Sequence, residues 1–325
     1  MSIKSDILKE FEKNKGETLS GAKLASALNV SRTSIWKHIE ELRKDGYEIT
    51  ASPNKGYSLS YKTDLISAEG ISPYLNDIFS NTEIHAFKTL ASTNITAKEL
   101  AANGAKHGTV VISEEQTAGR GRLGRNFYSP NKSGIYMSII LKPDLNFSDS
   151  VLITTAASVA ICRAIEKTTG INTEIKWIND IYLKGRKVCG ILTEASTDFE
   201  SGTIHHIILG IGINFNTPVE NFPEEIQNRA GSLFNDDSNK ISRNQLCAEI
   251  INEVLLITNN LKQHDFINEY KRRSIVLDKD IIFIKNGISI KGHAIDIQND
   301  GSLVVKKENG ELEILNSGEI SIRGI

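Results

Sequence analysis

The chain has 325 residues, of which 39% are hydrophobic and 24% charged, a composition typical of globular proteins and not of disordered ones. Lys and Arg number 38 against 40 Asp and Glu, so the net charge of -2 excludes a basic coat over the whole surface. Any nucleic-acid site must therefore be a local patch. At about 150 residues per domain, this length predicts two or three domains.

The cysteines and the apolar segments indicate the cellular compartment of the protein. Cys162, Cys189 and Cys247 are odd in number and form no Cys-x-x-Cys pair, which argues against a disulfide framework or a zinc cage. The first ten residues carry charges where a signal peptide needs an apolar segment. The longest apolar stretch, residues 151–161, is too short to cross a bilayer. These features predict a reduced, soluble protein of the cytoplasm.

Residues 1–62 predict a winged helix-turn-helix. Apolar residues recur at helical spacing from Ile3 to Phe11, and two shorter helices are expected to begin at Ser20 and Ser31, since serine is a favoured N-cap. Two short strands on either side of residues 52–56 would form the wing. In this motif the third helix lies in the major groove of DNA.

Polar side chains on the third helix and around it are the predicted DNA contacts, because they carry donors suited to phosphates and base edges. Residues 1–60 contain ten Lys and Arg against eight Asp and Glu. We expect Trp36 to pack inside the domain. A small helical domain with a solvated polar face is the alternative. The predicted DNA contacts are Ser20, Ser31, Arg32, Thr33, Ser34, Lys37, His38 and Lys55.

Residues 63–273 form the larger predicted unit, in which runs of strands do not alternate regularly with helices. The long helices are expected at 92–102, 151–168, 242–261 and 264–273, and the strands at 109–113, 134–141, 173–177, 181–183, 187–193 and 203–213. This order favours an α+β fold with a largely antiparallel sheet. The last unit, 274–325, holds about five short β-rich runs separated by turns such as Asn-Gly, which predict a small β-barrel.

The segment 116–125 reads Gln-Thr-Ala-Gly-Arg-Gly-Arg-Leu-Gly-Arg, with three Gly and three Arg in seven positions. Glycine lets a backbone approach a ligand closely, and arginine offers planar charged forks that match phosphate or carboxylate. Where the loop is extended, Arg120 and Arg122 share a face. We interpret it as a mobile loop that folds over an anionic ligand. A solvated surface loop and an RNA-binding patch are the alternatives.

Three further clusters carry polar groups. Lys176 and the Asn179-Asp180 pair, followed by Lys187, could hold phosphates or a magnesium ion. The segment 210–214, Gly-Ile-Gly-Ile-Asn, would let a ligand approach a strand end, but it lacks the third glycine and the helix of a dinucleotide fingerprint. Ser92-Thr93-Asn94 offers hydroxyl and amide groups where a helix begins. Alone, each cluster also suits a turn, a surface lysine or a helix cap.

In this order the clusters resemble the bifunctional biotin–protein ligases that also repress the biotin operon. The family pattern is S-T-N, Q-x-x-G-R-G-R-x-G-R, K-W-P-N-D, K-x-x-G-I-L-x-E and G-x-G-I-N. This chain supplies it at residues 92–94, 116–125, 176–180, 187–194 and 210–214. Ile178 replaces the usual proline, and Phe127 stands where an aromatic residue is expected to cover the adenine. The resemblance implies a winged helix-turn-helix (1–62), a ligase domain (63–273) and a small SH3-like β-barrel (274–325).

The resemblance also implies the reaction. A biotin–[acetyl-CoA-carboxylase] ligase uses ATP and Mg²⁺ to form biotinyl-5′-AMP and transfers biotin to a lysine of a biotin carboxyl carrier protein. The adenylate also acts as corepressor, so that a homodimer binds the biotin operator; no membrane partner is implied. A lipoate–protein ligase, a catalytically inactive ligand-sensing transcription factor and a ligase that never meets DNA are the alternatives.

Roles for single residues follow from the same resemblance. The residues implied for biotin are Ser92, Thr93, Asn94, Gln116, Arg120, Gly121, Arg122, Lys187, Gly190, Gly210 and Gly212. Those implied for ATP are Arg122, Arg125, Phe127, Lys176, Asn179, Asp180, Lys187 and Asn214. Lys187, Arg122 and Arg125 would neutralise the phosphates during catalysis. Asp180 would assist deprotonation of the acceptor lysine.

Overall fold

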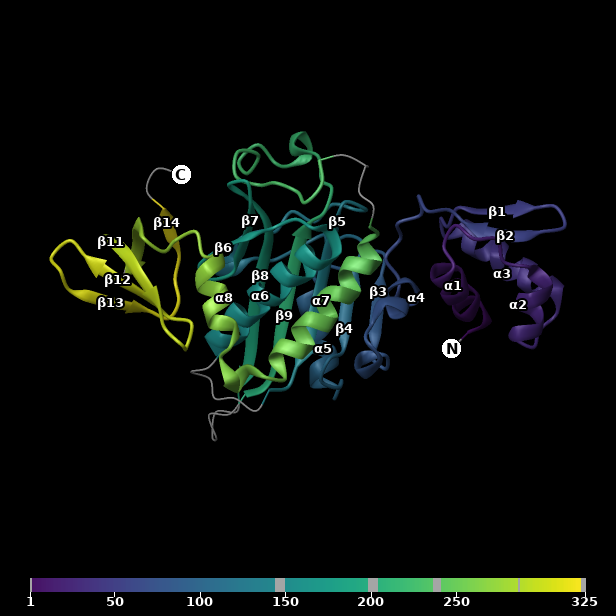
Figure 1. The fold of residues 1–325 in the computed structure, drawn as a ribbon, viewed down its shortest axis with the longest axis horizontal. Helices are drawn as coiled ribbons and strands as arrows, with labels where there is room; N and C mark the ends of the chain where they lie inside the picture. Colours follow the sequence, from purple (N-terminus) through teal and green to yellow (C-terminus); the bar gives the residue numbers. More distant parts are fainter. Residues whose placement is uncertain (1, 144–149, 198–203, 236–240, 286, 323–325) are drawn as a thin grey trace. The chain divides into compact units, whose positions relative to one another are not determined.

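The computed structural model describes residues 2–143, 150–197, 204–235, 241–285 and 287–322 (Figure 1). The chain forms two compact units. The first comprises Met1–Asn81 and Ile241–Glu249, and the second comprises Thr82–Lys240 and Ile250–Ile325. Within the described ranges, no helix is long and apolar enough to cross a membrane.

The first unit contains the predicted winged helix-turn-helix. Its helices are α1 (Ile3–Lys13), α2 (Gly21–Ala27) and α3 (Arg32–Lys44), and its wing is the antiparallel pair β1 (Ile49–Ser52) and β2 (Gly56–Leu59). The hydroxyl groups of Ser2, Ser20 and Ser31 cap the three helices by accepting backbone N–H groups. A core that includes Phe11 and Ile39 joins the helices to the wing.

Trp36 does not lie in this core. Its side chain is 54% exposed, so the prediction that it packs inside the domain is wrong. Ile35 and Ile39 occupy the inward face of α3. Because successive helical residues are rotated by about 100°, Trp36 is turned away from that face.

A buried ion pair ties the segment after the wing to the beginning of α7 (Arg243–Thr258). Arg243 is fully buried, and its Nε and backbone N–H each donate to the Asp64 carboxylate at 2.9 Å. Beside it, Asn244 donates to the Leu65 carbonyl at 2.8 Å and accepts the Ser67 N–H at 3.1 Å. These contacts explain why residues 241–249 belong to the first unit. The unit also contains α4 (Ala68–Ile71) and two short 3-10 helices, η1 (Ser72–Tyr74) and η2 (Asp77–Phe79).

The second unit is built on a seven-stranded sheet with the order β3-β4-β5-β9-β8-β7-β6. Its strands are β3 (Ile84–Phe87), β4 (Val110–Ser113), β5 (Gly134–Leu141), β6 (Glu174–Lys176), β7 (Asp180–Leu183), β8 (Arg186–Thr197) and β9 (Ile204–Asn214). The β3–β4 pair is parallel and the other pairs are antiparallel, which confirms the predicted largely antiparallel sheet. In the turn between β7 and β8, Lys184 and Gly185 both have positive φ, as a tight hairpin requires.

Helices cover both faces of this sheet. Thr154 on α6 (Ser150–Thr169) hydrogen-bonds Thr193, whereas Asn94 on α5 (Thr93–Ala102) hydrogen-bonds Glu194. Because neighbouring strand residues point to opposite faces, α5 and α6 lie on opposite sides of the sheet. Figure 1 shows α6 together with α8 (Phe266–Arg273), and these two helices pack against each other.

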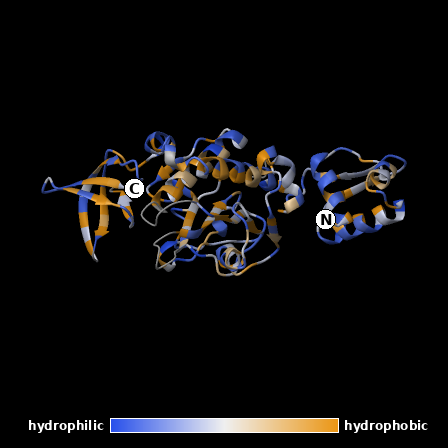
Figure 2. Ribbon diagram, turned by 90° about the horizontal axis from the view of Figure 1, so that it is seen from below, coloured by the Kyte–Doolittle hydropathy of each residue, from blue (hydrophilic) through white to orange (hydrophobic). Residues whose placement is uncertain are grey.

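The C-terminal segment forms an antiparallel sheet with the order β13-β12-β11-β10-β14. Its strands are β10 (Lys279–Lys285), β11 (Ile288–Ile297), β12 (Leu303–Lys307), β13 (Leu312–Leu315) and β14 (Ile320–Ile322). Apolar and polar residues are interleaved along these strands (Figure 2), and one face, with Ile281 and Phe283, is buried. The predicted five strands are confirmed. Their closure into a barrel is not, because β13 and β14 are the two edges of the described sheet.

We expect Asp64→Ala to lower the free energy of unfolding of the first unit by about 3 kcal/mol, because the buried Arg243 side chain loses its ion pair with the Asp64 carboxylate. Urea unfolding of the full-length protein measures the change. Glu10→Ala, which removes an exposed ion pair with Lys13, is the control and should cost less than about 1 kcal/mol. Equal effects of the two substitutions would contradict this view of the Arg243 pair.

Candidate functional site

A cavity of about 390 Å³ opens in the second unit. Every residue that the sequence suggested for a biotin or ATP site lines it, although these residues come from segments far apart in the chain. They are Ser92, Thr93, Asn94, Gln116, Arg120, Gly121, Arg122, Arg125, Phe127, Lys176, Asn179, Asp180, Lys187, Gly190, Gly210, Gly212 and Asn214. Their individual roles stay predictions.

The register of the sheet brings the motifs together. Lys176 pairs with Asp180, Asp180 with Gly190, Gly190 with Gly212 and Gly212 with Tyr136, which forms one row across five strands. Residues paired directly across strands have their side chains on the same face. Three sequence motifs therefore meet in one line on the face of the sheet that also carries α5.

Glycines form the floor of the cavity because side chains of other site residues lie where a Cβ atom would be. A Cβ on Gly212 would lie 2.5 Å from the Phe127 ring, and a Cβ on Gly210 would lie 2.3 Å from the Asn94 amide oxygen. On Gly190, a Cβ would meet the end of the Lys187 side chain at 3.1 Å. The glycines at 210 and 212 therefore let Asn94 and Phe127 lie directly on the sheet.

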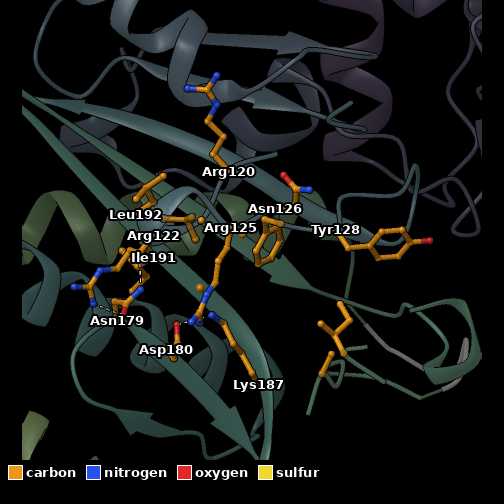
Figure 3. Close-up of a pocket in the computed structure, with 18 of the residues that line it drawn as sticks. Arg120, Arg122, Arg125, Asn126, Tyr128, Asn179, Asp180, Lys187, Ile191 and Leu192 are labelled. Atoms are coloured by element: carbon orange, nitrogen blue, oxygen red, sulfur yellow. Dashed lines mark hydrogen bonds and ion pairs between the residues drawn. The ribbon is translucent and has the colours of Figure 1, made fainter. Parts of the chain in front are cut away.

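The arginine-rich loop is folded back on itself. The Gly121 N–H donates to the Arg125 carbonyl at 2.7 Å, and the Phe127 N–H donates to the Gly119 carbonyl at 2.9 Å. Arg122–Gly124 form a single 3-10 turn, η3. Gly121, between Arg120 and Arg122, is extended, and the turn begins directly after it. In Figure 3 the Arg120 side chain points away from Arg122.

Cationic groups gather at one end of the cavity (Figure 3). Arg122 donates to the Asn179 amide oxygen at 3.0 Å, and Lys187 lies 2.6 Å from the Asp180 carboxylate. Arg125 pairs with Glu319 at 2.6 Å. Burial lowers the pKa of Lys176, which the nearby Asp180 carboxylate partly offsets. This end of the site is suited to a ligand with several negative charges, such as a polyphosphate.

Hydroxyl and amide groups gather at the other end. Ser92, Thr93 and Asn94 are buried at the beginning of α5. The Thr93 N–H donates to Gln116 Oε1 at 2.8 Å, and Gln116 Nε2 donates to the Ser129 hydroxyl at 3.0 Å. Uncharged donors and acceptors in a fixed arrangement suit a neutral polar group of a ligand.

Sequence reasoning missed two parts of the lining. Phe222, Ile226 and Arg229 come from the segment that follows β9, and the Lys187 N–H donates to the Arg229 carbonyl at 2.8 Å. Residues 318–321 come from the C-terminal sheet. Neither segment carries a motif, so only the folded chain could reveal them. The Trp177–Ile178 peptide, where the family pattern has a proline, is cis.

The cavity offers oxygen ligands for a magnesium ion but no cage. Asp180 and Asn179 provide carboxylate and amide oxygens at the cationic end. Across the described ranges, no group of three His, Cys, Asp or Glu could hold a metal. Magnesium is often bound through one or two carboxylates together with substrate phosphates. These residues therefore fit an ion that enters with a nucleotide.

The predicted DNA contacts lie on the first unit. Arg32, Thr33 and Lys37 are exposed on α3, and Lys55 is exposed in the turn of the wing. His38 and Ser34 are partly buried, and His38 lies 3.0 Å from Glu41. Ser20 and Ser31 are the helix caps described above.

Comparisons with known families divide the chain into three matched segments. A helix-turn-helix domain matches residues 4–58, the biotin/lipoate A/B protein ligase family matches 86–214, and the biotin protein ligase C-terminal domain matches 276–323. The class of protein is therefore a biotin/lipoate-type ligase that carries a helix-turn-helix domain.

Similarity to single proteins extends over nearly the whole chain. The bifunctional ligase/repressor BirA of Bacillus subtilis is 35% identical over 97% of this chain and 98% of its own length. BirA of Escherichia coli is 27% identical over 95% of this chain and 94% of its own length. The structure of the Aquifex aeolicus biotin protein ligase with biotin and ATP is 27% identical, covers 74% of this chain and 98% of that one, and has a TM-score of 0.63. The chain belongs to the family of bifunctional biotin–protein ligase/repressors.

We expect Gly210→Ala to lower the free energy of unfolding by about 1–3 kcal/mol, since the new methyl group would overlap the fixed Asn94 amide. Gly190→Ala is the matched control on the same face of the sheet. There the obstacle is the flexible end of Lys187, so the cost should stay below about 1 kcal/mol. Thermal unfolding of both variants tests this, and equal losses would count against the proposed role of the glycine floor.

Proposed function

We propose that the cavity is the place where biotin is adenylated and then passed to a carrier protein. The protein is an ATP-dependent biotin–protein ligase of the bifunctional ligase/repressor family. One observation supports the site above all: a neutral hydroxyl–amide end and a cationic end occupy the same cavity over a glycine floor. Biotin has a neutral ureido ring and an anionic carboxylate, and ATP brings the phosphates, so these two ends match the two substrates.

At the neutral end, Ser92, Thr93, Asn94 and Gln116 would hydrogen-bond the ureido ring of biotin. Gly210 and Gly212 would contribute by letting Asn94 and Phe127 lie directly on the sheet beside the ligand. Arg120, Gly121 and Arg122 would lie along the valeryl chain and carboxylate, near Lys187 and Gly190. Phe127 would provide a surface for the adenine.

At the cationic end, Lys187, Arg122 and Arg125 would neutralise the phosphates, and Lys176, Asn179, Asp180 and Asn214 would complete the nucleotide site. A biotin carboxylate oxygen attacks the α-phosphorus, the bond to the pyrophosphate oxygen breaks, and pyrophosphate leaves. Positioned cations stabilise the charge that develops on the phosphate oxygens. A Mg²⁺ ion that entered with ATP would supply further positive charge near Asn179 and Asp180.

In the second step the amine of an acceptor lysine attacks the carbonyl carbon of biotinyl-5′-AMP, and AMP leaves. The amine must first lose a proton, and Asp180 is the proposed acceptor. Asp180 is paired with Lys187 at 2.6 Å. A phosphate that drew Lys187 away would free this carboxylate for the proton transfer. The proposed acceptor protein is the biotin carboxyl carrier protein of acetyl-CoA carboxylase.

The first unit would make the protein a repressor. We propose that α3 and the wing contact the biotin operator, and that biotinyl-5′-AMP promotes a homodimer that matches a palindromic site. We add Trp36 to this surface because it is a large exposed apolar side chain on an otherwise polar helix face. The cytoplasm, which holds both ATP and DNA, is the proposed location. The division at 1–62, 63–273 and 274–325 remains our proposal for the domains.

The first experiment is an adenylation assay with α-labelled ATP, Mg²⁺ and biotin, lipoate or octanoate in parallel. We expect labelled adenylate with biotin alone. Adenylate with lipoate would point to a lipoate ligase. No adenylate with any acid would favour an inactive sensor.

In the same assay, Lys187→Ala should slow adenylate formation by about ten- to a hundredfold, the effect of losing a charge-assisted contact worth roughly 1.5–3 kcal/mol. Lys106→Ala, at an exposed lysine outside the cavity, is the control and should adenylate at the wild-type rate. A wild-type rate of adenylate formation in Lys187→Ala would contradict the proposed role of this lysine in neutralising the phosphates.

For the DNA surface, Arg32→Ala and Trp36→Ala should each weaken binding to operator DNA by about ten- to a hundredfold and leave adenylation unchanged. Lys13→Ala, on α1, is the matched control. Gel-shift titrations with the promoter of the chain's own biotin genes measure the affinity. Unchanged binding in both α3 variants would mean that α3 is not the recognition helix.

A further inference from the structure

Glu194 on β8 does not line the cavity, but two donors beside the cavity converge on it. Asn94 Nδ2 donates to Glu194 Oε2 at 2.7 Å, and Lys98 Nζ donates to Glu194 Oε1 at 2.6 Å. Each carboxylate oxygen thus has its own donor. A side-chain amide in this place has a single oxygen, so it could accept a hydrogen bond from only one of these two donors.

Both the helix and the sheet place these groups together. Asn94 and Lys98 are four residues apart on α5 and therefore lie on one side of it. Glu194 pairs with Ile208 across the sheet, two residues along β8 from Leu192 in the cavity wall. Burial raises the pKa of Glu194, but the hydrogen bonds from Lys98 and Asn94 outweigh it, with help from the charge of Arg120, and the net pKa is lowered. Glu194 is therefore ionised at neutral pH.

An ionised carboxylate decides which way the Asn94 amide faces. Because it can only accept hydrogen bonds, Nδ2 must face Glu194, and Oδ1 must face the other way. There Oδ1 meets the Ser138 hydroxyl at 2.6 Å. Oδ1 has no proton, so the Ser138 hydroxyl must be the donor in this bond.

Thr93 belongs to the same hydrogen-bond network as Asn94 and Ser138. Its hydroxyl accepts from the Ser138 hydroxyl at 2.7 Å and donates to Gln116 Oε1 at 3.2 Å. Gln116 Oε1 also accepts the Thr93 backbone N–H at 2.8 Å, so it receives two hydrogen bonds from Thr93. Thr93 then keeps one oxygen lone pair for a ligand, and Asn94 keeps one amide hydrogen. A ureido group needs both an acceptor for its N–H and a donor for its carbonyl.

We propose that Glu194 is a positioning residue that sets the donor and acceptor pattern of Asn94 for the ureido ring of biotin. The proposal rests on the proposed function of the cavity as a biotin site. Lys98 supports the carboxylate from outside and does not touch the ligand. Glu194 thereby contributes to the choice of biotin over acids that have no ureido group.

The test measures biotin affinity by titration calorimetry and the KM for ATP by adenylation. Glu194→Ala should bind biotin about tenfold more weakly, the equivalent of about 1.4 kcal/mol, with the KM for ATP unchanged. Glu194→Gln should stay within about threefold of wild type, because its amide oxygen can still accept from Asn94 while the half-exposed Lys98 turns to water. Glu313→Gln, which breaks an ion pair of equal length with Lys285 in the C-terminal sheet, is the control.

A double-mutant cycle separates positioning from a general structural effect. If Glu194 acts through Asn94, Glu194→Ala should cost nothing further in an Asn94→Ala background. Additive losses, or an equal rise in the KM for ATP, would overturn the proposal. So would unchanged biotin affinity in Glu194→Ala when Asn94→Ala binds weakly. Failure of the wild-type protein to bind biotin would instead overturn the biotin site itself.

Discussion

The antiparallel register of the central sheet is the constraint on which the rest of the site depends. It aligns Lys176, Asp180, Gly190 and Gly212, four residues from three separate motifs, in one row on one face. A shift of one residue between β8 and its neighbours would turn Gly190 to the opposite face and put a bulky side chain in its place. Buried apolar residues on the other face, under α6, oppose such a shift, so the energy of the core also holds the site in register.

The polar side chains at the two ends of the cavity are held in different ways. At the neutral end, hydrogen bonds among Thr93, Asn94 and Ser138 fix the orientations of these three side chains. At the cationic end, charges pair with acidic groups that a phosphate can replace, as Lys187 pairs with Asp180. Rigid recognition of a neutral ring requires the first arrangement, because unpaired polar groups are costly when buried. Entry and exit of a highly charged nucleotide favour the second.

The first unit follows simpler rules. Ser20 and Ser31 begin helices, and the apolar stripe of α3 fills the core, so its polar face remains outside. The sequence predicted this arrangement correctly except at Trp36. Its aromatic side chain suggested burial, but its position on the helix turns it toward solvent. The ion pair of Arg243 with Asp64 joins positions 179 residues apart, and no local pattern could have indicated it.

The sequence by itself determined the winged helix-turn-helix, the α+β class, most strand positions and the set of motif residues that line the cavity. These depend on local periodicity, turn residues and short motifs, which the chain carries within a few positions. Only the tertiary structure decided the sheet order, the folded course of the loop between Gln116 and Phe127, and the contributions of Arg229 and Glu319. It alone also brought Glu194 against Asn94. The reason is physical: such contacts are selected by burial and hydrogen bonding across the whole fold, between residues whose separation along the chain carries no signal of their meeting.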